Sequence, residues 1–213
     1  LPENGMASLT HSGRYHDARA TTFAYAAGST MMEPREKEIH SYVQAHLQFD
    51  AVIGDNEKAF FTKRLEKSFS ILPHTILEMF LLDQRRITIK ITQDTGFPMG
   101  MHTTPRGNAA ARNYDIVMLR EHQNWSEDCF IGGFLRELGH VVRQKPPESE
   151  WPSARGDRAR FKEQLEDAAD TAVWRWGLRH YSMAYLQATF PPHWVERIVE
   201  RVSEMMLEAG DWC

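Results

Sequence analysis

The spacing of apolar residues predicts helices in the first third of the chain. Apolar side chains recur there every three to four residues, which is typical of helices with one buried face. Pro73 is expected at the first position of the third helix, where no backbone donor is needed. The buried faces are Ile39, Val43 and Leu47 after Pro34, then Phe60, Phe61, Leu65 and Phe69 after a cap at Asp55 or Asn56, then Ile76, Leu77, Phe80 and Leu81 after Pro73.

Two strands are expected next. Residues 86–92 alternate polar and β-branched apolar side chains over seven positions, which predicts a half-buried strand. A second strand is expected from Tyr114 to Leu119, with Ile116 and Met118 on one face and Val117 on the other. Glycine and proline between the two strands predict a long irregular stretch; they are Gly96, Pro98, Gly100, Pro105 and Gly107.

Helices return in the last third of the chain. Ser126 is expected to cap a helix, and the buried stripe of this helix is Phe130, Phe134, Leu138 and Val141. A loop follows, with Pro146, Pro147, Pro152 and Gly156. One long helix is expected from about Asp157 to Tyr181, with Trp174 and Trp176 on opposite faces, one in the core and one facing a cleft. A last helix is expected from Pro191-Pro192 to near Gly210.

This order indicates one domain over residues 34–213. Residues 34–143 form its N-terminal α/β subdomain, and residues 144–213 form a helical C-terminal subdomain. Residues 1–33 are rich in Ala, Ser, Thr and Gly and lack sustained periodicity, so we expect a loose N-terminal arm there.

The composition of the chain reduces the number of function classes to consider. A net charge of −4 argues against a surface for nucleic acid, and the basic run from Arg155 to Lys162 is expected to be a solvated helix start. No apolar run is long enough to cross a bilayer, and residues 1–33 lack the apolar core of a signal peptide. We therefore expect a soluble protein without a membrane partner, in an unknown compartment. Cys129 and Cys213 form no disulfide framework, and Cys129 is expected to be a buried free thiol.

The candidate chemistry lies in the segment Arg136-Glu137-Leu138-Gly139-His140. In the pattern H-E-x-x-H, two histidines on one helical face bind zinc and the glutamate acts as general base. Arg136 stands at the first histidine position, and arginine stays protonated and has no lone pair for a metal. Arg136, Glu137 and His140 are expected on one side of the helix.

A second cluster of candidate residues follows on the long helix. Glu166 and Asp170 are one helical turn apart within Glu166-Asp167-Ala168-Ala169-Asp170. A carboxylate ligand with a second carboxylate that orients a ligating histidine is a recurrent arrangement in metal sites. Gly139 is expected to let another backbone approach the first helix, and the alanines Ala168, Ala169 and Ala172 are expected to pack closely beside Glu166 and Asp170.

These two segments resemble the gluzincin branch of the zincin metallopeptidases. The resemblance covers roughly residues 86–181, with a size and element order similar to anthrax-lethal-factor-type catalytic domains and the Pro-Pro endopeptidases. It implies a zincin-like α+β fold, in which a small sheet packs on an active-site helix and a helical C-terminal subdomain follows. It also implies that Glu137 is the general base and that His140 and Glu166 are zinc ligands. Asp170 would accept a hydrogen bond from a ligating side chain, and His180 or Tyr181 would donate a hydrogen bond to the transition state.

Arg136 is the departure from the family pattern. A dication 4 Å from a guanidinium meets a repulsion of about 8 kcal/mol at an effective dielectric near 20. Only His140 and Glu166 remain as ligands, whereas Arg136 is well placed to pair with Glu166 or Glu137 and hold the two helices together. We therefore expect no cofactor and a proteolytically inactive pseudoenzyme that binds a peptide or a protein.

Three alternatives stay open. The first is an active zinc-dependent peptidase with an altered ligand set, in which His102 or His122 supplies a ligand. The second is a metal-free enzyme that uses Glu137, His140 and Arg136 on a small molecule, which predicts a closed, largely apolar pocket. The third is a purely structural helical protein. The substrate or partner and the oligomeric state are not predicted.

Overall fold

A computed structural model describes residues 33–82, 86–93, 100–106 and 113–210. Contacts divide the chain into residues 1–31 and 32–213, and the description concerns the second unit. The predicted arm (apart from Glu33), Cys213, Gly96, Pro98 and Gly107 lie outside the described residues.

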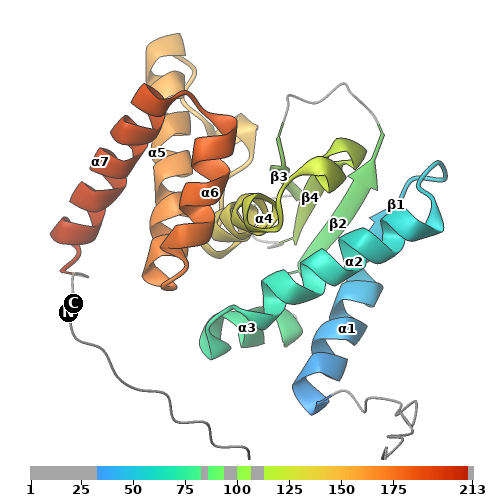
Figure 1. Ribbon diagram of the computed structural model, residues 1–213. Coiled ribbons are helices and arrows are strands. Elements are labelled where there is room, and N and C mark those ends of the chain that lie inside the picture. Colours follow the sequence, from blue (N-terminus) through green and yellow to red (C-terminus); the bar gives the residue numbers. More distant parts are fainter. Residues whose placement is uncertain (1–32, 83–85, 94–99, 107–112, 211–213) are drawn as a thin grey trace, which may run out of the picture. The chain divides into compact units, whose positions relative to one another are not determined.

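The described part of the chain is α+β, with a small four-stranded sheet (Figure 1). Its helices are α1 (Pro34–His46), α2 (Asp55–Ser70), α3 (His74–Leu81), α4 (Glu127–Val142), α5 (Arg155–Arg175), α6 (Arg179–Thr189) and α7 (Pro192–Glu208). Its strands are β1 (Leu47–Phe49), β2 (Arg86–Thr92), β3 (His102–Arg106) and β4 (Asn113–Leu119).

The sheet has the order β1-β2-β4-β3. The strands β1, β2 and β4 are parallel, and β3 pairs with β4 as an antiparallel edge strand. The two predicted strands are confirmed, and in both the apolar face is buried as expected, with Ile116 and Met118 fully inside and Val117 half-buried.

Two strands were not expected from the sequence. Leu47, assigned to a helical stripe, instead begins β1, which is only three residues long and therefore shows no period. β3 lies inside the predicted irregular stretch and contains Pro105. Proline is tolerated in a strand only at an edge, where its nitrogen faces away from the neighbouring strand. The prediction failed because this edge position could not be seen in the sequence.

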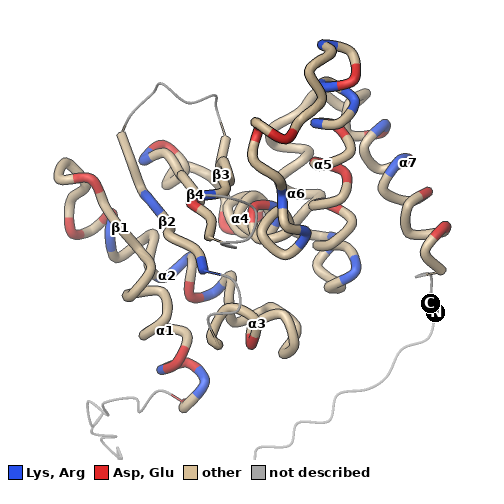
Figure 2. Tube along the Cα trace, turned by 180° about the vertical axis from the view of Figure 1, so that it is seen from behind, with Lys and Arg blue, Asp and Glu red and all other residues tan. Residues whose placement is uncertain are grey.

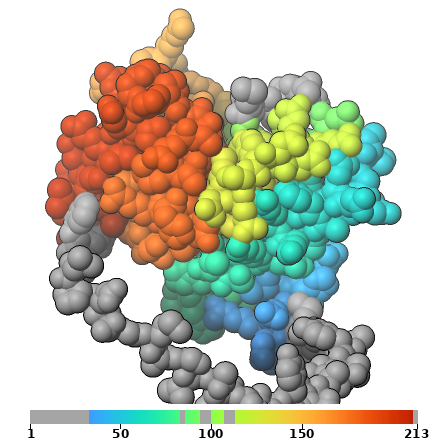
Figure 3. Space-filling model, viewed as in Figure 1, coloured from blue at the N-terminus to red at the C-terminus, as the bar shows by residue number. Residues whose placement is uncertain are grey.

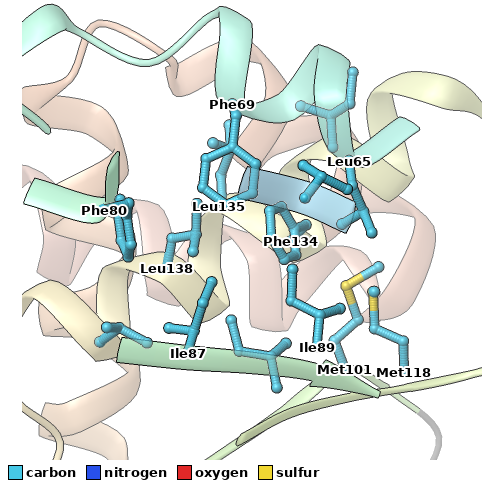
Figure 4. Packing of buried hydrophobic residues seen from close by; sticks show 14 of the residues in the cluster. Leu65, Phe69, Phe80, Ile87, Ile89, Met101, Met118, Phe134, Leu135 and Leu138 are labelled. Carbon is cyan, nitrogen blue, oxygen red and sulfur yellow. The ribbon is translucent and has the colours of Figure 1, made fainter. Parts of the chain in front are cut away.

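Helix α4 is buried on all sides, from Cys129 to Val141. Ser126 caps it as predicted, since its side chain accepts a hydrogen bond from the Cys129 N–H. On one side Phe134 and Leu138 lie between Phe69 of α2 and the isoleucines of β2 (Figure 4). Burial of each such side chain contributes about 1.5–3 kcal/mol. The predicted stripe is correct, but it describes only the face toward the sheet.

The opposite side of α4 packs against α5 and α6. A Cβ atom on Gly132 would lie 1.9 Å from the Tyr181 carbonyl oxygen, and one on Gly139 would lie 2.7 Å from that of Ala169. The backbones therefore touch, which confirms the close approach expected at Gly139. Figure 3 shows α4, in yellow, between α2 and α6. This packing holds the motif helix against the carboxylates of α5.

The predicted long helix from Asp157 to Tyr181 is wrong at its end, because the chain breaks at residues 176–178. Gly177 has φ +76°, and its N–H donates to the Trp174 carbonyl while the Leu178 N–H donates to that of Val173. This hydrogen-bond pair terminates helices when glycine adopts a left-handed conformation. Apolar residues continue across the break, so the periodicity did not reveal it.

The remaining expectations concern the surface and the termini of the helices. Arg155, Arg160 and Lys162 are exposed, as a solvated helix start requires, and both basic and acidic residues occur along α5 and α7 (Figure 2). Cys129 is buried and free. None of the helices in the described ranges is long and apolar enough to cross a membrane.

Candidate functional site

The structure brings the candidate residues of α4 and α5 into one ion-pair cluster. The Nη2 atom of Arg136 lies 3.0 Å from Oε2 of Glu166, and its Nε atom lies 3.0 Å from Oδ2 of Asp170. His140 Nε2 lies 3.1 Å from the same Oε2 atom of Glu166. A single carboxylate oxygen is therefore shared by the arginine and the histidine. Arg136 thus pairs with Glu166, as one of the two partners that the sequence suggested.

Burial and charge oppose each other in this cluster. Burial alone would raise the pKa of Glu166, but Arg136 and His140 outweigh it and hold the pKa well below its usual range. Burial alone would lower the pKa of Arg136, but Asp170 and Glu166 outweigh it and raise the pKa. The guanidinium and the Glu166 carboxylate are therefore both charged at neutral pH.

Asp170 connects the cluster to α6. Its side chain is fully buried, and its Oδ1 atom accepts a hydrogen bond from Ser182 Oγ at 3.3 Å. Ser182 Oγ in turn accepts from Trp174 Nε1 at 3.2 Å. Complete burial raises the pKa of Asp170, and Arg136 partly offsets this. Trp174 is thus in the core, as expected for one tryptophan of the pair. Trp176 also packs on the main core and is not among the described residues that line the cavity around Arg136 and Glu137.

Glu137 lies beside the cluster but does not join it. Its side chain is only 3% exposed, and its Oε2 atom has no hydrogen-bond partner among the described residues. Its backbone carbonyl accepts from Thr103 Oγ1 at 3.3 Å, which ties β3 to the motif turn of α4. The Oε2 atom of the side chain that the sequence resemblance assigns as general base therefore has no hydrogen-bond partner in the described part of the chain.

A cavity of about 850 Å³ opens above these residues. Arg136, Glu137 and His140 line it together with the start of β3, including His102. Exposed side chains such as Arg160 and Trp194 also line it, so it is open to solvent and mixed in polarity. This cavity therefore differs from the closed, largely apolar pocket expected for a metal-free enzyme.

His180 and Tyr181 are not brought to this cavity. His180 is exposed and its ring contacts that of Tyr181 in a tilted arrangement, with 3.9 Å between ring centroids, and Tyr181 packs on the main core. Tyr185, one turn later on α6, lines the cavity instead, with its ring 5.8 Å from the Arg136 guanidinium carbon. Burial raises the pKa of Tyr185 to about 12. The sequence reasoning missed it because the break at Gly177 changes the direction of the chain before α6.

The two histidines considered as substitute ligands lie in different places. His102 lines the cavity, and burial lowers its pKa. His122 lies elsewhere, with Nδ1 accepting from the Leu119 N–H at 3.2 Å and its ring 4.2 Å from that of Trp125. Within the described ranges, no group of three His, Cys, Asp or Glu side chains is arranged to hold a metal ion.

A second arginine binds α5 from the other side. Arg201 of α7 contacts both carboxylate oxygens of Asp167, at 2.6 and 3.0 Å, and Glu163 at 2.9 Å. Its side chain is 33% exposed, against 9% for Arg136. The same chemistry thus occurs twice on α5, once buried and once near solvent.

Comparisons with protein-family models, curated protein sequences and solved structures found no significant match to this chain.

The substitution Arg136→Met is expected to lower the free energy of unfolding by about 3–5 kcal/mol, because it leaves two buried carboxylates without their cation. Arg201→Met is the matched control and should lower it less, by about 1–3 kcal/mol, because the Arg201 side chain is 33% exposed and water can partly replace it beside Asp167. Urea denaturation of both variants measures the difference. Equal losses would contradict a special role for the buried cluster.

Acid should destabilise the protein through His122. Burial lowers its pKa from 6.5 to about 4, so the unfolded chain binds a proton between these pH values and the folded chain does not. Stability therefore falls as pH decreases through this window, by up to about 3 kcal/mol. His122→Asn keeps an acceptor for the Leu119 N–H and does not titrate. Urea denaturation from pH 7 to pH 4 should show that the free energy of unfolding falls less in the variant than in the unmodified protein. An equal fall in both proteins would refute the assignment of this pH dependence to His122.

Proposed function

We propose that this chain is a zincin-like domain in which Arg136 has taken the place of the zinc ion, and that it binds a peptide or protein without cleaving it. The observation that carries the proposal is the shared Oε2 atom of Glu166. In the resemblance to gluzincins this carboxylate is a zinc ligand, and here it accepts contacts from Arg136 and His140 at 3.0 and 3.1 Å.

The residues present do not fit zinc. A zinc site in a peptidase takes three protein ligands with free lone pairs, and Arg136 offers none. The two remaining family ligands, His140 and Glu166, are turned toward each other at 3.1 Å, and the guanidinium supplies the positive charge that Glu166 would otherwise take from the metal. The cluster thus resembles a metal site in its residues while being held together by ion pairs.

The cluster also disfavours the metal-free enzyme. The Nη2 and Nε atoms of Arg136 pair with Glu166 and Asp170. This edge of the guanidinium is therefore not available to bind a substrate anion. His140 directs Nε2 to Glu166. Of the three residues in that hypothesis, only Glu137 has a buried polar atom without a partner among the described residues.

The sheet edge next to the cavity supports peptide binding. In a strand, consecutive residues direct their backbone N–H and C=O groups to opposite sides. Because Pro105 is tolerated only with its nitrogen away from β4, we infer that the backbone of Thr103 also faces the free edge of β3. Gly100, Met101 and His102 line the cavity just before it. An extended peptide that paired with Thr103 would therefore run along the cavity, as substrates of active gluzincins run along their sheet edge.

The metal part of the proposal predicts that the purified protein retains no stoichiometric zinc after incubation with zinc and desalting. Arg136→His should restore the family ligand set, retain about one zinc per chain and melt at a higher temperature when zinc is added, because binding to the folded state stabilises it. Plasma mass spectrometry and thermal denaturation measure the two quantities. Arg136→His combined with Glu166→Gln is the control and should lose the zinc. Stoichiometric zinc in the unmodified protein would overturn the proposal.

The binding part predicts that selection from a random linear-peptide library yields peptides with measurable affinity. Each backbone amide of a selected peptide is then N-methylated in turn. Because a peptide added to a sheet edge pairs through every second residue, the loss of affinity should alternate with a period of two. A library without binders would refute peptide binding, and equal effects at all positions would refute pairing with β3.

A further inference from the structure

The carboxylate of Glu137 has a buried oxygen atom without a hydrogen-bond partner among the described residues. The side chain of Glu137 is only 3% exposed, and no group among the described residues donates a hydrogen bond to its Oε2 atom. Leaving a buried polar atom without a partner is unfavourable, more so for a charged group. Glu137 lines the open cavity, so a molecule in that cavity can supply the missing donor.

The other acidic side chains that line the cavity already have cationic partners. Glu166 has Arg136 and His140, Asp167 and Glu163 share Arg201, and Glu148 has Arg158 at 2.6 Å. Glu137 therefore differs from every other acid of the cavity wall in the described part of the chain.

The charge near Glu137 favours a cation as that donor. Three carboxylates, Glu137, Glu166 and Asp170, lie around Arg136, whose guanidinium is bound to the second and third of them. The negative charge of Glu137 is the one left without a direct partner. A neutral N–H would satisfy the hydrogen bond, but a cation also balances this charge.

Three cations of the cavity wall oppose such a ligand: Arg160 and Lys162 are exposed, so water and salt screen their charge, whereas Lys145 is buried. Lys145 is 6% exposed and lines the cavity, and its positive charge acts on His102 and Glu166. Within the described residues it forms no ion pair with a carboxylate. Removing its charge would therefore favour a bound cation, whereas removing the charge of Glu137 would disfavour it.

We infer that the peptide bound by this domain presents a basic side chain, lysine or arginine, to Glu137. This inference rests on the proposed peptide-binding function and names the specificity of that same cavity. The apolar stem of a basic side chain can pack on the aromatic rings of Phe190 and Trp194, which also line the cavity. Trp194 is 54% exposed, so a ligand can cover it.

The test uses three capped pentapeptides, each with four alanines around a central lysine, arginine or norleucine. Norleucine keeps the apolar stem of lysine without its charge. Titration calorimetry on the full chain should show the lysine or arginine peptide binding about tenfold more tightly than the norleucine peptide, the usual effect of one hydrogen bond to a charged group. The comparison of the lysine peptide with the arginine peptide shows whether the cavity prefers an ammonium or a guanidinium group.

Two variants give effects of opposite sign. Glu137→Gln, which keeps the shape of the side chain, should bring the basic peptides to the affinity of the norleucine peptide. Lys145→Met should raise the affinity for the basic peptides and leave the norleucine peptide unchanged. Circular dichroism confirms that both variants are folded, and Lys37→Met, at an exposed position of α1 outside the cavity wall, serves as a control for a change in net charge alone.

Equal binding of all three peptides, or a charge preference that survives Glu137→Gln, would overturn the inference and leave the proposed function intact. Absence of binding by all three would also overturn it, if the library selection yields peptides without basic residues. A library without any binder, in contrast, removes the proposed function itself.

Discussion

The buried pairing of Arg136 with Glu166 and Asp170 is the interaction on which the rest of this structure depends. It joins α4, which forms the core with the sheet, to α5, which begins the helical part of the chain. Three ionic side chains leave water to form it, and that transfer is unfavourable unless each charge meets its counterpart. The two carboxylates one helical turn apart on α5 meet this condition, because each contacts a different nitrogen of the same guanidinium.

In the proposed function, the same arrangement explains how the carboxylates of a zinc-like site are kept by an arginine. Glu166 and Asp170 require a positive charge between them and α4, whether it comes from a cation or from a side chain. Arginine satisfies that requirement from within the chain, and its planar group reaches both carboxylates in fixed geometry. Glu137 forms no ion pair among the described residues, so in the proposed function it is the residue of the motif that contacts the ligand. The proposal thus assigns binding and structural roles to neighbouring positions of one helix.

Much of this could be predicted from the sequence, because local patterns determine it. The alternation in residues 86–92, the Ser126 cap, the stripe from Phe130 to Val141 and the contact at Gly139 all depend on near neighbours in the chain. Other features depend on tertiary context. The three residues of β1 are defined only by pairing with β2, and Pro105 is compatible with a strand only because β3 lies at an edge. The placement of Tyr185 rather than Tyr181 at the cavity follows from the turn at Gly177, which the apolar periodicity conceals.

The glycine contacts of α4 have a consequence for how the cavity responds to a ligand. Gly132 and Gly139 bring the backbones of α6 and α5 against α4 with no space for one additional carbon atom. Helices packed at that distance cannot slide or tilt without breaking many contacts at once, so the wall that carries Glu137 and Arg136 is rigid. Adjustment is left to the exposed rim, where Trp194 and Arg160 can change rotamer. A ligand would then contact a rigid, preorganised charged wall and a flexible rim. Most of the conformational entropy lost on binding would come from the side chains of the rim.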